Sequence, residues 1–143
     1  MSYEYIKDPD AIYRASFAEI RSVTDFSAVP ADDHRMAERV IHACGMPEIV
    51  SDLVFRGGPS VAARNALKAG KPLLVDSNMT AHGIIRRALP AKNEVICTVE
   101  DSEAYAMAQQ MRTTRSAAAL ELWLDRLDGA VVVIGNAPTA LFH

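Results

Sequence analysis

Three side chains that can carry positive charge share one face of a segment with helical periodicity. Arg35, Arg39 and His42 stand at positions i, i+4 and i+7, which form one stripe on an α-helix. Guanidinium groups bind carboxylates through paired N–H donors, and a histidine can exchange a proton near neutral pH. The stripe predicts a site for a ligand with several carboxylates; the simpler alternative is a solvated basic face with a half-buried histidine.

Two further candidates follow predicted breaks in the chain. His82 comes shortly after the end of a predicted strand, where it either binds a ligand or caps local carbonyl groups. Arg115 follows Thr113-Thr114, at a predicted helix N-terminus, and such a terminus with an arginine favours anions. A surface arginine is the alternative reading. The sequence holds no GxGxxG, phosphate-loop or GxSxG pattern, so no motif supports a nucleotide site or a serine nucleophile.

The elements that position these residues alternate between helices and strands. Residues 130–135 are apolar at consecutive positions, which is typical of a strand buried on both faces. Such alternation predicts an α/β fold: a single domain over residues 1–143, with a parallel β-sheet core flanked by helices in a three-layer, Rossmann-like arrangement. The predicted strands are 72–76, 94–99, 130–135 and a possible short one at 49–55; the predicted helices are 9–24, 30–45, 59–70, 80–88, 102–111 and 116–127.

Composition narrows the class of protein. The chain has 143 residues, of which 50% are hydrophobic and 23% charged, and its net charge of -3 argues against a nucleic-acid binder. No apolar run is long enough to span a bilayer, so we expect no membrane partner and a cytoplasmic location. In that compartment Cys44 and Cys97 are expected to be buried thiols rather than a disulfide, and they make a poor metal site.

Several separate segments resemble the precorrin-8X methylmutase family. Two are the most diagnostic, Ile41-His42-Ala43-Cys44-Gly45 and Gly135-Asn136-Ala137-Pro138-Thr139-Ala140. The match runs in the right order over essentially the whole chain. The other matching segments are Ala11-Ile12-Tyr13 with Ser16-Phe17, Ala81-His82-Gly83 with Leu89-Pro90 and Asn93–Cys97, and Thr114–Ala119.

The resemblance implies an isomerase of cobalamin (vitamin B12) synthesis that works as a homodimer with active sites near the subunit interface. Family members move a methyl group from ring carbon 11 to ring carbon 12 of precorrin-8X, which gives hydrogenobyrinate, and need no cofactor or protein-bound metal. The family's key histidine corresponds to His42, as proton donor or acceptor. Ser16, Arg39 and Arg115 stand where family members contact the corrinoid substrate, with Thr80 and His82 as further candidates.

The resemblance leaves several alternatives open. Family members continue past the position of His143, so the domain is expected to lack the family's C-terminal portion. A non-catalytic corrinoid-binding relative or fragment is therefore one alternative. A cobalt-precorrin-8 methylmutase that produces cobyrinate is another. An unrelated nucleotide-binding α/β protein is the least favoured, because no phosphate loop is present.

Overall fold

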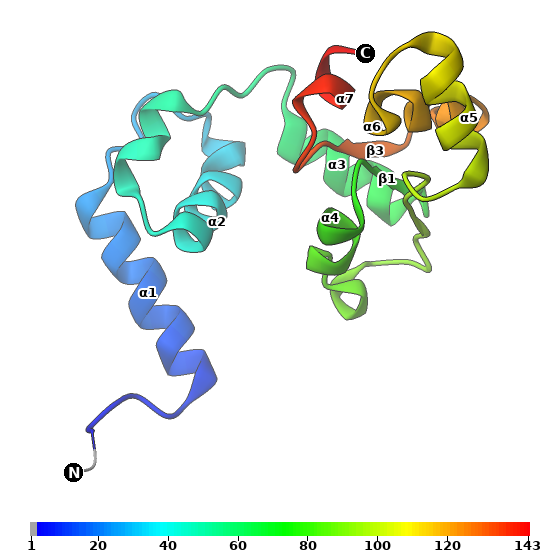
Figure 1. The fold of residues 1–143 in the computed structure, drawn as a ribbon. Coiled ribbons are helices and arrows are strands. Elements are labelled where there is room, and N and C mark those ends of the chain that lie inside the picture. Colours follow the sequence, from blue (N-terminus) through cyan, green and yellow to red (C-terminus); the bar gives the residue numbers. More distant parts are fainter. Residues whose placement is uncertain (1–2) are drawn as a thin grey trace. The chain divides into compact units, whose positions relative to one another are not determined.

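The computed structural model describes residues 3–143, which fall into two compact units. The first unit extends to Ala62 and the second runs from Ala63 to His143. Helix α3 (Pro59–Lys68) spans the boundary between them (Figure 1). The domain assignment made from the sequence stays a prediction. None of the helices within residues 3–143 is long and apolar enough to cross a membrane.

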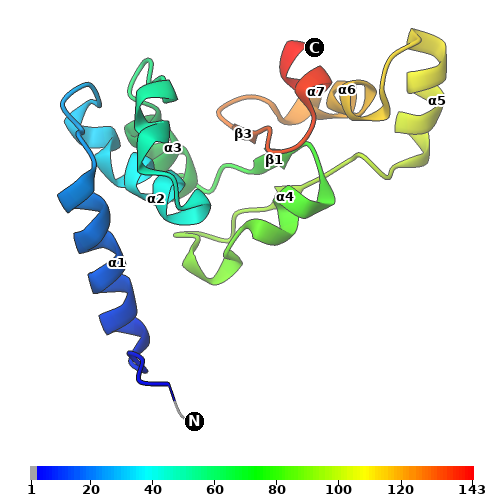
Figure 2. The same cartoon turned by 60° about the vertical axis from the view of Figure 1, so that its left-hand side comes forward.

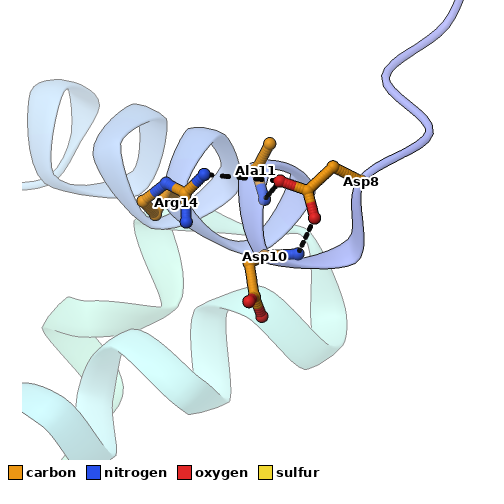
Figure 3. Close-up of polar contacts among 4 residues, drawn as sticks. All are labelled: Asp8, Asp10, Ala11 and Arg14. Atoms are coloured by element: carbon orange, nitrogen blue, oxygen red, sulfur yellow. Dashed lines mark hydrogen bonds and ion pairs between the residues drawn. The ribbon is translucent and has the colours of Figure 1, made fainter.

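Helix α1 (Pro9–Val23) opens the first unit with the start that the sequence predicts. The carboxylate of Asp8 accepts hydrogen bonds from the backbone N–H groups of Asp10 at 3.2 Å and Ala11 at 3.1 Å. The guanidinium of Arg14 reaches the same carboxylate at 3.5 Å (Figure 3). Asp8 therefore satisfies two amides that have no partner within the helix.

Helix α2 (His34–Cys44) packs against α1 (Figures 1 and 2). A short 3₁₀ turn, η1 (Ala31–Asp33), precedes it, and Gly45 ends it in the left-handed conformation at φ 70°. Gly45 ends the helix as predicted, because glycine adopts this conformation without a Cβ penalty. Ile20, Ala37 and Ile41 are buried in this unit.

Two predictions for the first unit are wrong. The possible strand at 49–55 is instead a 3₁₀ helix, η2 (Pro47–Asp52). Pro47 favours a helical first turn. The Ser51 hydroxyl donates to the Glu48 carbonyl at 2.9 Å, which supports hydrogen bonding within the turn over pairing with a neighbouring strand. Cys44 is exposed rather than buried, since it is the last residue of α2, where the chain leaves the packed part of the helix.

A parallel three-stranded sheet organises the second unit. Strand β1 (Leu73–Val75) is central and fully buried, with β2 (Val95–Ile96) on one side and β3 (Val131–Val133) on the other. The register places Leu73 opposite both Val95 and Val131. Helix α4 lies on one side of the strands, and α6 and α7 on the other, in both Figure 1 and Figure 2. This arrangement confirms the predicted α/β fold with a helix-flanked parallel sheet.

The helices of this unit are more broken than the sequence predicts. The expected helix at 80–88 is α4 (Asn78–Gly83) followed by η3 (Arg86–Ala88), because the backbone turns extended at Ile84, which packs into the core. The expected helix at 116–127 is α6 (Arg115–Ala118) followed by η4 (Ala119–Arg126). Helices α5 (Ser102–Met111) and α7 (Pro138–Phe142) complete the unit.

A buried polar contact explains the change from α6 to η4. The Thr98 hydroxyl donates to the Ala119 carbonyl at 2.8 Å, and this carbonyl would accept from the Trp123 amide in a continuing α-helix. The indole N–H of Trp123, itself 2% exposed, donates to the Thr98 oxygen at 2.9 Å. The Thr98 contact therefore directs the chain after Ala119 into the 3₁₀ helix η4 in place of a continuing α-helix.

Candidate functional site

A hydrogen bond between α1 and α2 joins two of the candidate residues in the first unit. The hydroxyl oxygen of Ser16 lies 2.8 Å from Nδ1 of His42. Ser16 is half-buried on α1, and His42 is exposed in the last turn of α2. The bond anchors one ring nitrogen and leaves Nε2 as the nitrogen that a ligand can meet.

Two aromatic side chains from α1 pack against the same imidazole. The His42 ring stacks on Phe17 at a centroid distance of 5.0 Å and on Tyr13 at 5.5 Å. The Arg39 guanidinium lies over both rings, 5.4 Å from the Phe17 centroid and 5.8 Å from that of Tyr13. Since Tyr13, Ser16 and Phe17 stand at i, i+3 and i+4, one face of α1 supplies every contact.

Two cavities of the first unit include this set of residues in their walls. One, of about 240 Å³, is lined by Ser16 and His42 together with apolar side chains that include Ile20 and Ile41. The other, of about 360 Å³, is lined by Phe17, Arg39 and further charged side chains. His42 therefore borders an apolar space, while Arg39 borders a charged one.

In the second unit, Thr80 belongs to a hydrogen-bond network around a buried carboxylate. Asp76, 1% exposed at the end of β1, accepts from the Thr80 hydroxyl at 3.0 Å and from the backbone N–H groups of Gly135 at 3.0 Å, Asn136 at 2.8 Å and Ala137 at 2.7 Å. Burial by itself would raise the pKa of Asp76. The three backbone amides and the Thr80 hydroxyl outweigh burial and hold this pKa below its ordinary value.

The hydroxyl of Thr80 is consequently engaged in hydrogen bonds within the protein. It gives its hydrogen to Asp76 and lies 2.9 Å from the Ser77 hydroxyl, while the Thr80 amide donates to Ser77 at 3.1 Å. A Cβ at Gly135 would lie 2.6 Å from the Thr80 oxygen, so a glycine is required there for close approach. Thr80 can offer a ligand an acceptor lone pair but not its proton.

His82 and Arg115 each have partners of their own in the second unit. Nδ1 of His82 lies 2.7 Å from the Asn78 carbonyl, and His82 borders a cavity of about 480 Å³ that Arg86 and Arg87 also line. Arg115 is the first residue of α6, as the sequence predicts, and Thr114 caps that helix. The Arg115 guanidinium lies 4.5 Å from the Tyr105 ring centroid and contacts the Tyr105 hydroxyl.

The structure thus brings Ser16, Arg39 and His42 together on the first unit. Thr80, His82 and Arg115 lie in the second unit, where no hydrogen bond joins one of them to another within the described chain. Across residues 3–143, no three His, Cys, Asp or Glu side chains gather in a way that could hold a metal ion.

Sequence reasoning missed three residues that shape these clusters. Tyr13 and Phe17 carried a signal, since they share the helical face of Ser16, but their contact with His42 depends on how α1 packs against α2. The sequence also pointed to Asp76, because this residue follows a buried strand. That signal is weak, since polar residues follow strands in most α/β proteins. The three backbone partners of Asp76 lie about 60 residues further along the chain and cannot be read from its neighbours.

Comparison with known proteins places the chain in a family. A family model described as precorrin-8X methylmutase matches residues 11–143. A precorrin-8X methylmutase of Pseudomonas aeruginosa is 52% identical over 140 residues, which cover 98% of this chain and 67% of that protein. A cobalt-precorrin-8 methylmutase of Methanocaldococcus jannaschii is 40% identical over 106 residues, which cover 74% of this chain and 48% of that protein.

A solved structure supports the same assignment. The precorrin-8X methylmutase of Thermus thermophilus superposes with a TM-score of 0.80 at 32% identity, over 93% of this chain and 65% of that one. This chain spans about two thirds of the length of the Pseudomonas and Thermus proteins. The match of residues 11–143 to the family model, with 52% identity over 98% of the chain, shows that it belongs to the precorrin-8X methylmutase family, whose members are isomerases.

Proposed function

We propose that this chain acts as an isomerase of cobalamin biosynthesis that converts precorrin-8X to hydrogenobyrinate. In this reaction the bond between ring carbon 11 and a methyl group breaks, and a bond between that methyl group and ring carbon 12 forms. Atoms and electrons balance without an oxidant or reductant. The observation that carries the proposal is the Ser16–His42 hydrogen bond of 2.8 Å beside the aromatic and guanidinium stack.

In this proposal His42 lends the macrocycle a proton that promotes the methyl shift and then takes it back. The Ser16 oxygen can accept from Nδ1–H in both the charged and the neutral ring, so this bond persists while Nε2 exchanges the proton. Stacking on Phe17 and Tyr13 further restricts the ring. Ser16 thus serves as a positioning residue for His42, in addition to the substrate contact implied by the family resemblance.

The surroundings of His42 suit a flat, partly apolar ligand with acidic side chains. The 240 Å³ cavity offers apolar walls to a methyl-bearing edge of the macrocycle. Arg39 is assigned to a carboxylate of the same ligand, and its position over two aromatic rings restricts its guanidinium group. Arg115 is proposed as a second contact for a substrate carboxylate. Thr80 and His82 are proposed either to accept hydrogen bonds from the substrate or to hold the local backbone in place.

The proposal extends to assembly and location. We assign a homodimer with active sites near the subunit interface and a cytoplasmic location, both on the basis of family membership. Analytical ultracentrifugation of the full-length protein tests the dimer: a monomer at micromolar concentration contradicts it.

The metal-free substrate is favoured over its cobalt form. The Pseudomonas relative, at 52% identity, is named for precorrin-8X, and the cobalt-named Methanocaldococcus relative is 40% identical over a shorter segment. Offering both substrates to the purified full-length protein separates them. Faster turnover of the cobalt form contradicts this choice.

The test of the catalytic proposal is His42→Ala. Loss of a positioned proton donor lowers turnover by about 10²–10⁴-fold, measured by the absorbance change from precorrin-8X to hydrogenobyrinate. His34→Gln is the matched control on the same helix, since His34 only bonds the Val29 carbonyl at 3.0 Å and packs against Phe26. Normal turnover by His42→Ala refutes the role of His42.

Ser16→Ala separates positioning from proton transfer. Without the hydroxyl, the His42 ring loses its Nδ1 anchor, so kcat falls and its pH profile shifts, while hydrogenobyrinate binding changes little. A change confined to KM assigns Ser16 to substrate binding alone. Tight hydrogenobyrinate binding without any turnover in the wild-type protein favours the non-catalytic binding alternative.

A further inference from the structure

A basic basin lies on the first unit, next to the His42 cluster. We use this name for the cavity of about 360 Å³ lined by Phe17, Arg21, Arg35, Glu38 and Arg39. Its walls come from one face of α1 and one face of α2. Three guanidinium groups and one carboxylate therefore border a single cavity with an aromatic wall.

The one carboxylate of the basin is already occupied. Arg21 lies 3.3 Å and 3.4 Å from the two oxygens of Glu38. The Glu38 side chain is only 13% exposed, so its charge is paired by the guanidinium that reaches it from α1. Across residues 3–143, Arg35 and Arg39 form no ion pair with any carboxylate.

The two unpaired guanidinium groups are placed for joint binding. Arg35 and Arg39 are one helical turn apart on α2, so their side chains neighbour each other and border the same cavity. Arg39 is held against Phe17 and Tyr13, which reduces the rotamer freedom it loses when a ligand binds. Like charges at this spacing repel, and an anion between them removes that repulsion.

We infer that Arg35 and Arg39 form a two-armed clamp for one carboxylate side chain of the corrinoid, which makes Arg35 a substrate-binding residue. The inference rests on the proposed function, because the macrocycle supplies the acetate and propionate groups. Glu38 keeps Arg21 engaged within the protein, so the clamp has two arms. His42 follows Arg39 by three residues, so the clamp and the proton-exchanging ring lie on the same face of α2.

The test measures the affinity of the full-length protein for hydrogenobyrinate by absorbance titration. Arg35→Gln should weaken binding about tenfold, as expected for loss of one charge-assisted contact at an open site. Arg35→Lys should recover part of this loss. Arg14→Gln is the matched control, because Arg14 lies on α1, pairs with Asp8 at 3.5 Å and does not line the basin.

A second arm identifies the ligand group. Hydrogenobyrinate derivatives with single carboxylates converted to carboxamides are titrated against wild type and Arg35→Gln. One derivative should bind wild type at least tenfold more weakly, because its carboxamide loses the charge-assisted contacts with both arginines, and it should lose nothing further with Arg35→Gln. Turnover should show a raised KM and an unchanged kcat for Arg35→Gln.

The outcomes are distinct. Wild-type affinity for Arg35→Gln overturns the clamp and leaves the proposed function standing. Failure of the wild-type protein to bind hydrogenobyrinate overturns both. If Arg35→Gln weakens self-association by sedimentation and leaves corrinoid affinity unchanged, the two arginines hold a carboxylate of a second protein copy and the clamp for substrate is wrong.

Discussion

Replacing Asp76 by Asn should destabilise the second unit, because Asp76 is a buried carboxylate that accepts four hydrogen bonds. The substitution keeps the shape of the side chain and removes its charge. In wild type, one carboxylate oxygen accepts from Gly135 and from Thr80, and the other accepts from Asn136 and Ala137. An amide NH₂ group at either position faces N–H donors, so at least one backbone amide loses its acceptor.

The least costly orientation puts the NH₂ group toward Thr80, whose hydroxyl can rotate and accept. Gly135 then loses its partner, and the Asn136 and Ala137 bonds lose their charge assistance. Hydrogen bonds to charged groups contribute about 1.5–3 kcal/mol each, and an orphaned buried amide costs about 1–3 kcal/mol. We expect a total loss of about 3 kcal/mol at neutral pH.

Urea unfolding measures this loss, with fluorescence of Trp123 as the probe. Trp123 is the only tryptophan of the chain and is buried in the second unit, so its signal reports that unit. Asp125→Asn is the control, because Asp125 is exposed and its replacement should change the free energy of unfolding by less than about 0.5 kcal/mol.

The pH dependence gives an independent check. Because the folded-state pKa of Asp76 is lowered, its contribution is fully present above the unfolded value of about 3.9 and is lost as pH falls through the folded pKa. The difference between wild type and Asp76→Asn should therefore shrink below about pH 4. A loss under about 0.5 kcal/mol at pH 7, or a difference that stays constant from pH 7 to pH 3, refutes this account of the network.

Two further substitutions test local contacts. Thr98→Val removes the acceptor of the buried Trp123 indole and the donor to the Ala119 carbonyl. This substitution should lower the free energy of unfolding by about 2 kcal/mol and alter the Trp123 emission spectrum. An unchanged midpoint of urea unfolding contradicts this prediction. Asp8→Ala removes the cap shown in Figure 3 and should cost about 1 kcal/mol in the first unit, seen as earlier loss of helical circular dichroism on heating; Asp8→Asn, which can still cap, should retain most of the stability.

The sequence predicted elements well where local chemistry decides. Pro9 with Asp8 marked the start of α1, Gly45 the end of α2, and Thr114 the break before α6. The short apolar run at 72–76 predicted a strand, which the structure shows as β1 at the centre of the sheet. In each case the residues that impose the conformation lie within a few positions of it.

Prediction failed where distant contacts decide. No nearby residue in the sequence predicts that Thr98 donates a hydrogen bond to the Ala119 carbonyl or that the following segment is a 3₁₀ helix. For the candidate site, the spacing of Arg35, Arg39 and His42 showed a shared helical face, whereas Ser16, Tyr13 and Phe17 join it through the packing of α1 on α2. The family resemblance supplied Ser16 without a geometric reason for it.

Helix α2 links the two proposals, because it carries the clamp and the proton-exchanging residue on successive turns. Its opposite stripe, Ala37 and Ile41, is 0% and 1% exposed and fixes how α2 sits on the rest of the first unit. A change in that stripe would move Arg35, Arg39 and His42 together relative to the contacts that α1 supplies. Core variants such as Ala37→Val should consequently lower both the affinity for hydrogenobyrinate and the rate of proton transfer. Arg35→Gln should lower the affinity alone, and Ser16→Ala should lower kcat alone.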